Sequence, residues 1–360
     1  MSFKINNIGR ITRELRGADG DCFMITSPVN RLYATGFTSS AGVVLIARER
    51  AWFFTDSRYS ESAAGSVEGV EVRQVSGRNG YTDAVNAVIS ELGLRRVGFE
   101  DGHVTYSEYA IWKTRLKASL FAMSETLDRL RAVKSAAELA AMKRAQRVSE
   151  RSFEQVLPLI SADISERELA AELICRFLKN GADDKSFDPI VVSGARSSMP
   201  HGVPTDNKIQ EGFLTIDFGV KVDGWCSDTT RTLCVGEPTR EMRRVYDTVL
   251  RAQLRGIETA RAGVSGKEVD EAARAVIGEA GYGEYFSHGF GHGLGLEVHE
   301  QPSASESNTA PLPSGAVISA EPGIYIPGRF GVRIEDVIYI TEGGSENITA
   351  LPKNMMIIRP

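Results

Sequence analysis

A strongly apolar stretch with one carboxylate in its middle limits most severely how this chain can fold. Residues 213–220 have the pattern of a buried strand, yet Asp217 stands at their centre. Asp223-Gly224, a pair typical of a two-residue hairpin turn, comes next, and residues 225–232 have the pattern of the returning strand. Because a buried carboxylate is costly unless it is paired or bound to a metal, this hairpin must supply Asp217 with a partner.

The expected register of this hairpin places a second carboxylate beside the first. A turn at residues 223–224 sets Asp217 opposite Thr230 and Gly219 opposite Asp228. Asp217 and Asp228 are then diagonal neighbours on one face of the hairpin, within reach of a shared ligand. Two such carboxylates repel each other unless a cation or a proton lies between them. The alternative interpretation is an acid pair at the rim of the hairpin, with Asp228 exposed to solvent.

Histidines are few, and three of the five lie together in a glycine-rich segment. They are His288, His292 and His299. Repeated glycines in this segment, residues 287–300, argue against a regular helix and allow the backbone close to an ion or a substrate. Histidine is the commonest nitrogen ligand of metals and the usual proton carrier near neutral pH. His201 stands in a loop rich in Gly, Ser and Pro, where one histidine is usually incidental.

Two further carboxylates follow the histidines. Glu321 ends a strand pattern over residues 318–321, and Glu335 alternates with Arg333 in the next strand pattern. Residues two apart in a strand share a face, so a surface salt bridge between Arg333 and Glu335 is the alternative to a ligand role. Neither glutamate is informative without the residues described above.

Together these residues form a set of hard donors. The set comprises Asp217, Asp228, His292, Glu321 and Glu335. Four carboxylates and one imidazole point to Mn²⁺, Co²⁺ or Zn²⁺ rather than to a structural thiolate site, and four negative charges balance two divalent ions. Two such ions roughly 3.5–4 Å apart can share a bridging hydroxide and clamp a tetrahedral intermediate.

The chain changes character between about residue 127 and residue 134. Before this point strand patterns alternate with helical ones, which predicts an α/β domain over residues 1–130. After it, Ser-x-x-Glu capping boxes that begin at Ser135, Ser165 and Ser265 predict three helices, and a further helix is expected shortly before the last box. Strand patterns lie between and after these helices, so residues 131–360 are expected to form an α+β domain.

The composition argues against several classes of protein. A formal net charge of -5 gives no reason to expect a nucleic-acid partner, which normally needs a basic surface. No apolar stretch approaches the roughly 20 residues that cross a bilayer, and residues 1–7 lack the apolar segment of an export signal. The four cysteines form no Cys-x-x-Cys pair, as expected of reduced thiols in a cytoplasmic protein.

The ordered ligand set resembles that of the pita-bread metallopeptidases. Motifs similar to those of the branch that contains aminopeptidase P and prolidase lie at residues 200–202, 288–295, 298–300, 321–325 and 332–336. Residues 30–37 and 54–59 resemble the non-catalytic N-terminal domain of that branch. The resemblance covers nearly the whole chain. It implies a creatinase-type α/β domain followed by an α+β pita-bread catalytic domain.

The resemblance also implies a role for each ligand. Asp217 would be a terminal ligand of one metal, and His292 would be a terminal ligand of the other. Asp228 and Glu335 would contact both metals. Glu321 would bind one metal and handle the proton of the reaction.

Further residues would serve the substrate. By the same resemblance, His288 and His299 would contact the substrate and its developing oxyanion. His201 would line the pocket for proline and relay a proton. Tyr325 and Arg333 would contact the substrate or support the ligands.

The expected function is hydrolysis of the peptide bond in front of a proline by a metal-bridging hydroxide, as an Xaa-Pro aminopeptidase or an Xaa-Pro dipeptidase. The resemblance implies a cytoplasmic homodimer that acts on proline-containing peptides and binds two divalent ions, with Mn²⁺ expected ahead of Co²⁺ or Zn²⁺. Two alternatives use the same fold: a metal-free, creatinase-like amidinohydrolase and a non-enzymatic binding module. Either should lack part of the ligand set, whereas this chain has all five residues. The sequence leaves open whether dipeptides or longer peptides are the substrates.

Overall fold

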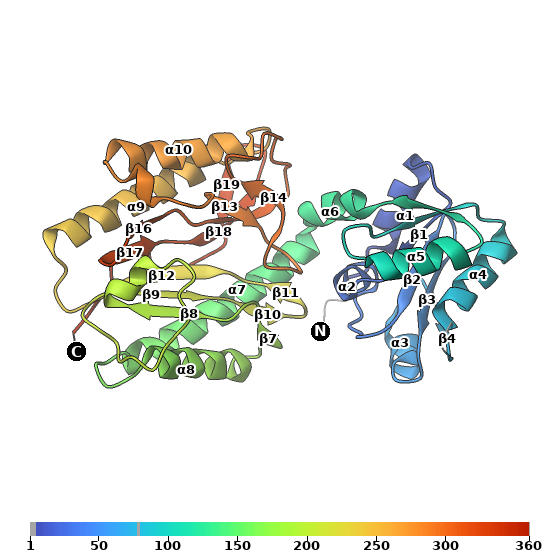
Figure 1. The fold of residues 1–360 in the computed structure, drawn as a ribbon, viewed down its shortest axis with the longest axis horizontal. Coiled ribbons are helices and arrows are strands. Elements are labelled where there is room, and N and C mark those ends of the chain that lie inside the picture. Colours follow the sequence, from blue (N-terminus) through green and yellow to red (C-terminus); the bar gives the residue numbers. More distant parts are fainter. Residues whose placement is uncertain (1–4, 78–79, 360) are drawn as a thin grey trace. The chain divides into compact units, whose positions relative to one another are not determined.

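The computed structural model describes residues 5–77 and 80–359. The chain divides into two compact units, Met1–Arg131 and Ala132–Pro360 (Figure 1). The first four residues, on which the expectation about an export signal partly rests, lie outside the described part. Within the described residues, none of the helices combines the length and the apolar character that a bilayer crossing demands.

The first unit is an α/β domain, as predicted. Its strands form one sheet in the order β4-β3-β2-β1-β5-β6, in which β1 pairs antiparallel with β2 and parallel with β5. The strands are β1 (Cys22–Ile25), β2 (Val43–Ala47), β3 (Ala51–Thr55), β4 (Glu71–Gln74), β5 (Arg96–Phe99) and β6 (Ser119–Ala122). The helices are α1 (Ile8–Gly17), α2 (Pro28–Thr35), α3 (Ser60–Ser66), α4 (Gly80–Leu92), α5 (Tyr106–Arg115) and α6 (Ser124–Ala132).

Capping boxes begin three helices of the second unit, as the sequence predicts. Each serine side chain accepts a hydrogen bond from the backbone of the glutamate three residues later, and the glutamate side chain bonds back to the backbone of the serine. Thr239 caps the remaining long helix in a similar way, by accepting from Met242 N. The helices are α7 (Ala136–Val156), α8 (Glu166–Lys179), α9 (Arg240–Thr259) and α10 (Gly266–Glu279), with short 3₁₀ turns η1 (Leu157–Leu159), η2 (Gly194–Ser198) and η3 (Gly283–Tyr285).

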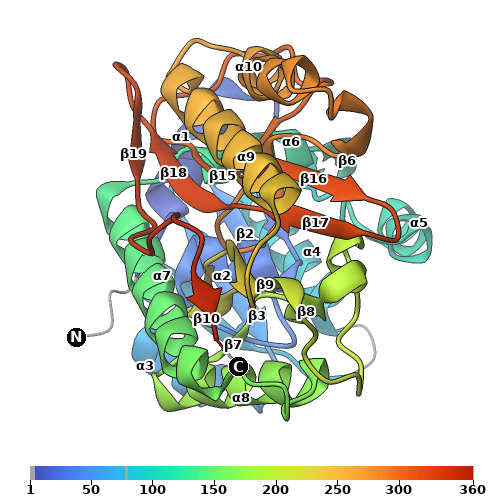
Figure 2. The same ribbon diagram turned by 90° about the vertical axis from the view of Figure 1, so that its left-hand side faces the viewer.

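The strands of the second unit lie between these two helix pairs. Figures 1 and 2 show α9 and α10 on one side of the strands, with α7 and α8 on the other. The larger sheets have the strand orders β20-β12-β9-β8 and β14-β13-β15-β18-β19. The strands of the first half are β7 (Asp184–Lys185), β8 (Ile190–Ser193), β9 (Gly212–Phe218), β10 (Val220–Val222), β11 (Trp225–Cys226) and β12 (Thr229–Val235). Those of the second half are β13 (Gly291–Gly293), β14 (Glu300–Ala304), β15 (Val317–Ala320), β16 (Gly323–Ile326), β17 (Phe330–Arg333), β18 (Asp336–Ile340), β19 (Ser345–Asn347) and β20 (Ile357–Ile358).

Two apolar clusters fill the spaces between helices and sheets. In one of them Phe153 of α7 stacks on Phe218 of β9, with ring centroids 4.9 Å apart. In the other, Val249 of α9 and Ala273 of α10 pack with strand residues such as Ile318. The second unit is therefore an α+β domain in which the sheets are covered by helices on both sides.

The predicted hairpin is present in the predicted register. Val222 pairs with Trp225, so Asp223 and Gly224 form the turn, and their φ angles of 52° and 82° are those of a turn with two left-handed central residues. Further along the same hairpin, Asp217 lies directly opposite Thr230.

Candidate metal centre and substrate cavity

Five elements deliver the five predicted ligands to one cavity of about 770 Å³. Asp217 lies in β9, and Asp228 immediately precedes β12. His292 lies in β13, Glu321 directly follows β15, and Glu335 lies between β17 and β18. Residues far apart in the sequence therefore meet at this cavity, which strands of both larger sheets line.

Atoms of the predicted ligands are close enough together to share a cation. His292 Nε2 lies 3.1 Å from Glu321 Oε1 and 3.6 Å from Asp228 Oδ2. One ligand atom from each of Asp228, His292 and Glu335 lies within 4.8 Å of the other two. An imidazole and carboxylates at these distances can coordinate a divalent cation.

Two carboxylates of this centre each keep one oxygen without a hydrogen-bond partner among the described residues. Asp217 Oδ2 accepts from Arg333 and Glu335 Oε2 accepts from Thr230, but Asp217 Oδ1 and Glu335 Oε1 are buried and unpartnered. Asp228 is only 4% exposed, so the solvated acid pair considered above is excluded. Buried anionic oxygens without partners are unfavourable unless a cation neutralises them, so the donor set fits divalent ions.

Burial and mutual repulsion both act on these acids. Burial, and after it the charge of Asp217, raises the pKa of Asp228 well above its usual range. Burial also raises the pKa of Glu335 well above its usual range, and the charges of Asp228 and Glu321 add to this effect. The carboxylates therefore resist being ionised together near neutral pH unless positive charge lies between them.

His292 and Glu321 behave differently because they face each other. Burial opposes the charge on both groups, but their mutual hydrogen bond and opposite charges outweigh it. The pKa of His292 rises to about 9, and the pKa of Glu321 falls to about 2. A metal ligand must be a neutral imidazole, so a cation bound at Nε2 would displace the extra proton.

Two hydroxyl groups that the sequence analysis did not assign to the site hold the ligands in place. Thr230 Oγ1 donates to Glu335 Oε2 at 2.7 Å and accepts from Arg333 Nε at 3.0 Å. Ser319 Oγ accepts from His292 N at 2.9 Å and donates to Glu321 Oε1 at 2.8 Å. Thr230 could have been found from its predicted place opposite Asp217, and Ser319 from its position two residues before Glu321 on the same strand face.

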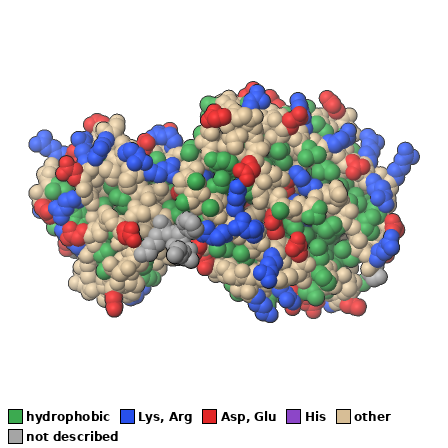
Figure 3. Space-filling view, turned by 180° about the vertical axis from the view of Figure 1, so that it is seen from behind, with side chains coloured by type: hydrophobic (Ala, Val, Ile, Leu, Met, Phe, Trp, Pro, Cys, Tyr) green, Lys and Arg blue, Asp and Glu red, His purple; other side chains and the backbone are tan. Residues whose placement is uncertain are grey.

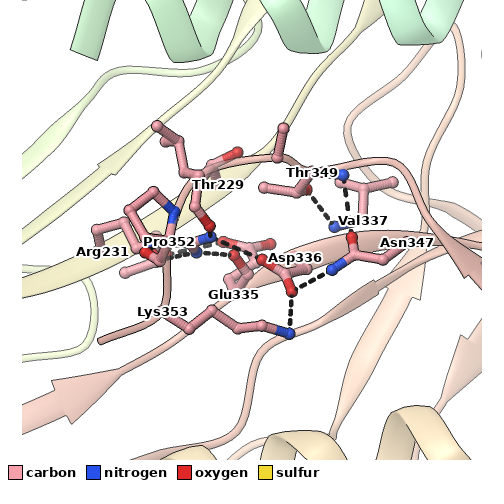
Figure 4. A network of polar contacts seen from close by, with 12 residues as sticks. Thr229, Arg231, Glu335, Asp336, Val337, Asn347, Thr349, Pro352 and Lys353 are labelled. Carbon is pink, nitrogen blue, oxygen red and sulfur yellow. Dashed lines mark hydrogen bonds and ion pairs between the residues drawn. The ribbon is translucent and has the colours of Figure 1, made fainter. Parts of the chain in front are cut away.

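A charged network lies behind Glu335 (Figure 4). Arg231 is fully buried and donates to the backbone carbonyls of Thr230 and Glu335 and to Asp336 Oδ1. Asp336 Oδ2 accepts from Asn347 and from Lys353, both at 2.6 Å. The carbonyl of Glu335 and the side chain of the next residue, Asp336, are thus anchored by side chains that do not line the cavity.

Arg333 is buried, and its guanidinium is already engaged. It donates to Asp217 at 2.6 Å, to the Tyr325 hydroxyl at 2.8 Å and to the Pro200 carbonyl at 3.2 Å, in addition to Thr230. The surface salt bridge with Glu335 considered above is therefore wrong, because the acidic partner of Arg333 is Asp217, in a strand of a different sheet.

His288 continues the same chain of contacts. Its Nε2 lies 2.9 Å from the Tyr325 hydroxyl, and its Nδ1 lies 2.9 Å from the Gly289 carbonyl. A carbonyl can only accept, so Nδ1 carries the proton and Nε2 accepts from Tyr325. Burial lowers the pKa of His288, which agrees with a neutral ring.

The remaining predicted site residues border the open part of the cavity. The ring of His299 lies 4.3 Å from that of His292, centroid to centroid, and burial followed by the charge of His292 lowers the pKa of His299. His201 is exposed and lines the cavity from the loop after η2. Apolar side chains line the rest of this space, among them Ala170, Ile174, Phe187, Ile190, Val203 and Pro204.

Family models match both units of the chain. Residues 8–133 match the creatinase/prolidase N-terminal domain, and residues 140–342 match metallopeptidase family M24.

Relatives along nearly the whole chain agree with these matches. The uncharacterized peptidase YqhT of Bacillus subtilis is 43% identical over 344 residues, which are 95% of this chain and 96% of the relative. An Xaa-Pro dipeptidase of Pyrococcus horikoshii is 35% identical over 339 residues, which are 93% of this chain and 94% of the relative.

Solved structures of related enzymes also superpose on nearly the whole chain. An Xaa-Pro dipeptidase from Bacillus anthracis superposes with a TM-score of 0.93 at 42% identity, covering 98% of this chain and 99% of that one. An X-Pro aminopeptidase from Thermotoga maritima gives a TM-score of 0.91 at 36% identity, covering 96% of this chain and 100% of that one. With the acidic, histidine-containing centre in place, these likenesses show that the chain is a metallopeptidase of family M24, preceded by a creatinase/prolidase N-terminal domain.

Proposed function

We propose that the protein is a dinuclear-metal exopeptidase that hydrolyses the Xaa-Pro peptide bond, as an Xaa-Pro aminopeptidase or an Xaa-Pro dipeptidase. The observation that carries this proposal is the convergence of four carboxylates and one imidazole in a single cavity, with two buried oxygens left without partners. Relatives named Xaa-Pro dipeptidase and X-Pro aminopeptidase supply the substrate class.

The proposed ligands are divided between two metal ions according to the side chains that hold them. Asp217, held by Arg333, would bind one metal, and His292 would bind the other. Asp228 and Glu335 would contact both, and Glu321 would bind beside His292. Two bound cations would supply an acidified water and would polarise the carbonyl of the scissile bond.

The chain's own residues would then move the proton and stabilise the charge. Glu321 is the proposed carrier of the proton from the attacking water to the proline nitrogen, because its carboxylate lines the cavity beside His292. His299 is the proposed donor to the developing oxyanion, since its pKa is lowered and its ring borders the open cavity. In the neutral state described above, His288 Nε2 is an acceptor, so we assign His288 to contact with the substrate and not to donation to the oxyanion.

The substrate side of the cavity would select proline by shape. A tertiary amide has no N–H, and the proline ring has a fixed form that the apolar lining can fit. His201 is the proposed polar contact on that side, whereas the Tyr325 hydroxyl, engaged by Arg333 and His288, would act through those two residues. Arg333 would orient Asp217 and Tyr325, because its donors are already engaged with the protein.

The proposal extends to the metal, the assembly and the cell compartment. Mn²⁺ is the proposed metal, since oxygen ligands dominate the set. A homodimer is proposed from the resemblance to the prolidase branch, and a cytoplasmic location is proposed from four cysteines that are all free. On the face that Figure 3 draws, Lys and Arg side chains are interspersed with Asp and Glu. A proline-containing peptide is proposed as the partner because relatives are named Xaa-Pro dipeptidase. Sedimentation of the purified protein tests the dimer.

The experiment that tests the function compares substrates of equal length. The metal-loaded protein should hydrolyse Xaa-Pro peptides with a far higher kcat/KM than Xaa-Ala peptides, and exhaustive chelation should abolish the activity until Mn²⁺ or Co²⁺ is restored. Comparable kcat/KM for Xaa-Pro and Xaa-Ala would reduce the proposal to a general metallopeptidase. Full activity in protein shown to be metal-free by elemental analysis would overturn the metal mechanism.

A further inference from the structure

The segment that carries His288 is held from outside the cavity by two residues of α10. Phe290 N donates to Asp270 Oδ1 at 2.8 Å. Arg274 donates to the carbonyls of Phe286 and His288, both at 2.9 Å, and its guanidinium carbon lies 4.2 Å from the centre of the Phe286 ring. These contacts bind the backbone of residues 286–290 at three points.

Asp270 and Arg274 also bind each other, which makes them one unit. Arg274 Nε lies 2.9 Å from Asp270 Oδ2, and its terminal nitrogen lies 3.1 Å from Oδ1. This two-point contact fixes the plane of the guanidinium, so that its remaining donors face the carbonyls of the segment. The Asp270 side chain is fully buried, whereas the Arg274 side chain is 32% exposed.

The held segment leads directly to the proposed catalytic groups. Phe290 O accepts from Glu321 N at 2.8 Å, and the His288 ring contacts Tyr325. The Phe290 ring is fully buried against Gly256 of α9, where an added Cβ would lie 2.2 Å from a ring atom. The segment therefore has little room to shift by itself, and a displacement on the α10 side would reach both His288 and Glu321.

We propose that Asp270 and Arg274 are positioning residues for peptide hydrolysis, which set the places of His288 and Glu321 through residues 286–290. The cavity is lined by His288 and Gly289 but by neither Asp270 nor Arg274, so the pair acts without touching the substrate. A buried ion pair adds little net stability, because the cost of removing its charges from water offsets their attraction. Apolar side chains could pack α10 against the sheet equally well, so stability alone does not explain this pair. The inference rests on the proposed function, because it concerns the rate of that reaction.

The test uses the metal-loaded full chain and three variants of the pair. Arg274→Ala and Asp270→Asn should lower kcat for Xaa-Pro hydrolysis by roughly 10–100-fold with little change in KM, because the groups that they displace act on the reacting bond. Arg274→Lys keeps the positive charge but loses the planar two-point contact with Asp270. Its kcat should therefore lie between the kcat of these two variants and that of the wild type. Lys267→Ala is the matched control, since it removes an exposed i,i+4 pair with Glu271 from the same helix.

Two further measurements separate positioning from a general loss of structure. Millimolar guanidinium should restore part of the kcat of Arg274→Ala, because the site of the lost side chain is partly open to solvent. Hydrogen exchange followed by mass spectrometry should show faster exchange at residues 286–292 in Arg274→Ala and Asp270→Asn, and no change there in Lys267→Ala.

The outcomes distinguish this inference from the proposed function. Wild-type kcat in Arg274→Ala, or unchanged exchange at residues 286–292, would overturn the positioning role while leaving the peptidase proposal intact. An inactive metal-loaded wild type would count against the peptidase and, with it, against a positioning role in that reaction. Loss of kcat in the Lys267→Ala control equal to that in Arg274→Ala would also overturn the inference.

Discussion

At the scale of single residues, the hydrogen bonds that side chains make to one another decide which of them can still bind a substrate. Arg333 is the clearest case. An arginine fork suits the free carboxylate of a C-terminal proline, yet here the guanidinium contacts Asp217, Tyr325 and Thr230. Its engaged donors favour a role in support of the ligands.

Arg333→Lys should therefore lower the hydrolysis of Xaa-Pro dipeptides and of Xaa-Pro-Yaa peptides together, by roughly 10–100-fold, and should weaken metal binding. A lysine cannot hold Asp217 and the Tyr325 hydroxyl at once in the same plane. Steady-state kinetics with both substrates and metal analysis provide the measurement, and Arg329→Lys, which alters an exposed pair with Glu241, is the control. A loss confined to dipeptides would show instead that Arg333 binds the substrate carboxylate.

The histidines allow metal binding and catalysis to be separated. His299→Ala should retain its metal and lose on the order of 10²–10³ in kcat, the effect of removing one oxyanion donor. His292→Ala removes a proposed ligand and should lower metal content and activity together. Metal analysis alongside kinetics distinguishes the two, with the exposed His103 as the control position for His→Ala. Wild-type turnover in His299→Ala would refute the role assigned to it.

At the scale of elements, the hairpin of β9 to β12 carries two proposed ligands and depends on its turn. Gly224 has a φ of 82°, a conformation that side chains with a Cβ adopt at a cost. The register that places Asp217 opposite Thr230 continues from this turn without a shift. The turn therefore contributes to the site although it lies outside the cavity.

Gly224→Ala should lower the free energy of unfolding by about 1–2 kcal/mol, the cost of a left-handed conformation for a residue with a Cβ. Urea denaturation of the purified variant measures this change. Gly343→Ala is the matched control, because no atom lies within 4 Å of its added Cβ and its φ is not in the left-handed range. Equal stability of the two variants would show that the turn carries no such strain.

At the scale of the whole molecule, we expect the acidic centre to couple metal binding to stability. Burial raises the pKa values of Asp228 and Glu335. A carboxyl with a raised folded-state pKa contributes stability below its unfolded pKa, near 4, and this contribution is lost as the pH rises through the folded pKa. Cations that bind the ionised carboxylates neutralise their charge and so restore the stability that is lost as the pH rises.

The melting temperature should thus respond to metal more strongly at higher pH. We expect the difference between Mn²⁺-loaded and chelator-stripped protein to widen from about pH 5 to about pH 8, because metal binding needs the deprotonated ligands. Calorimetry of both forms across this range is the measurement. A difference that stays constant or shrinks as the pH rises would contradict the coupling.

Much of this architecture is local and was therefore readable from the sequence. Capping boxes satisfy backbone groups within four residues, so Ser135, Ser165 and Ser265 marked the starts of α7, α8 and α10. The hairpin register follows from a two-residue turn in the same way. Helix α3 carries no comparable local signal, because its sequence, Ser-Glu-Ser-Ala-Ala-Gly-Ser, buries only Ala63 and has no apolar period.

The choice between competing partners of the site's charged side chains was decided by the tertiary structure. Arg333 stands two residues from Glu335 in the sequence, but the fold pairs it with Asp217, which is 116 positions away. The hydrogen bonds between α10 and residues 286–290 also could not be predicted from the sequence. They join Asp270 and Arg274, four residues apart in α10, to a segment that has neither helical nor strand spacing. Spacing can tell which residues share a face, whereas the choice between competing partners depends on distances, burial and hydrogen-bond directions that exist only once the sheets and helices have packed.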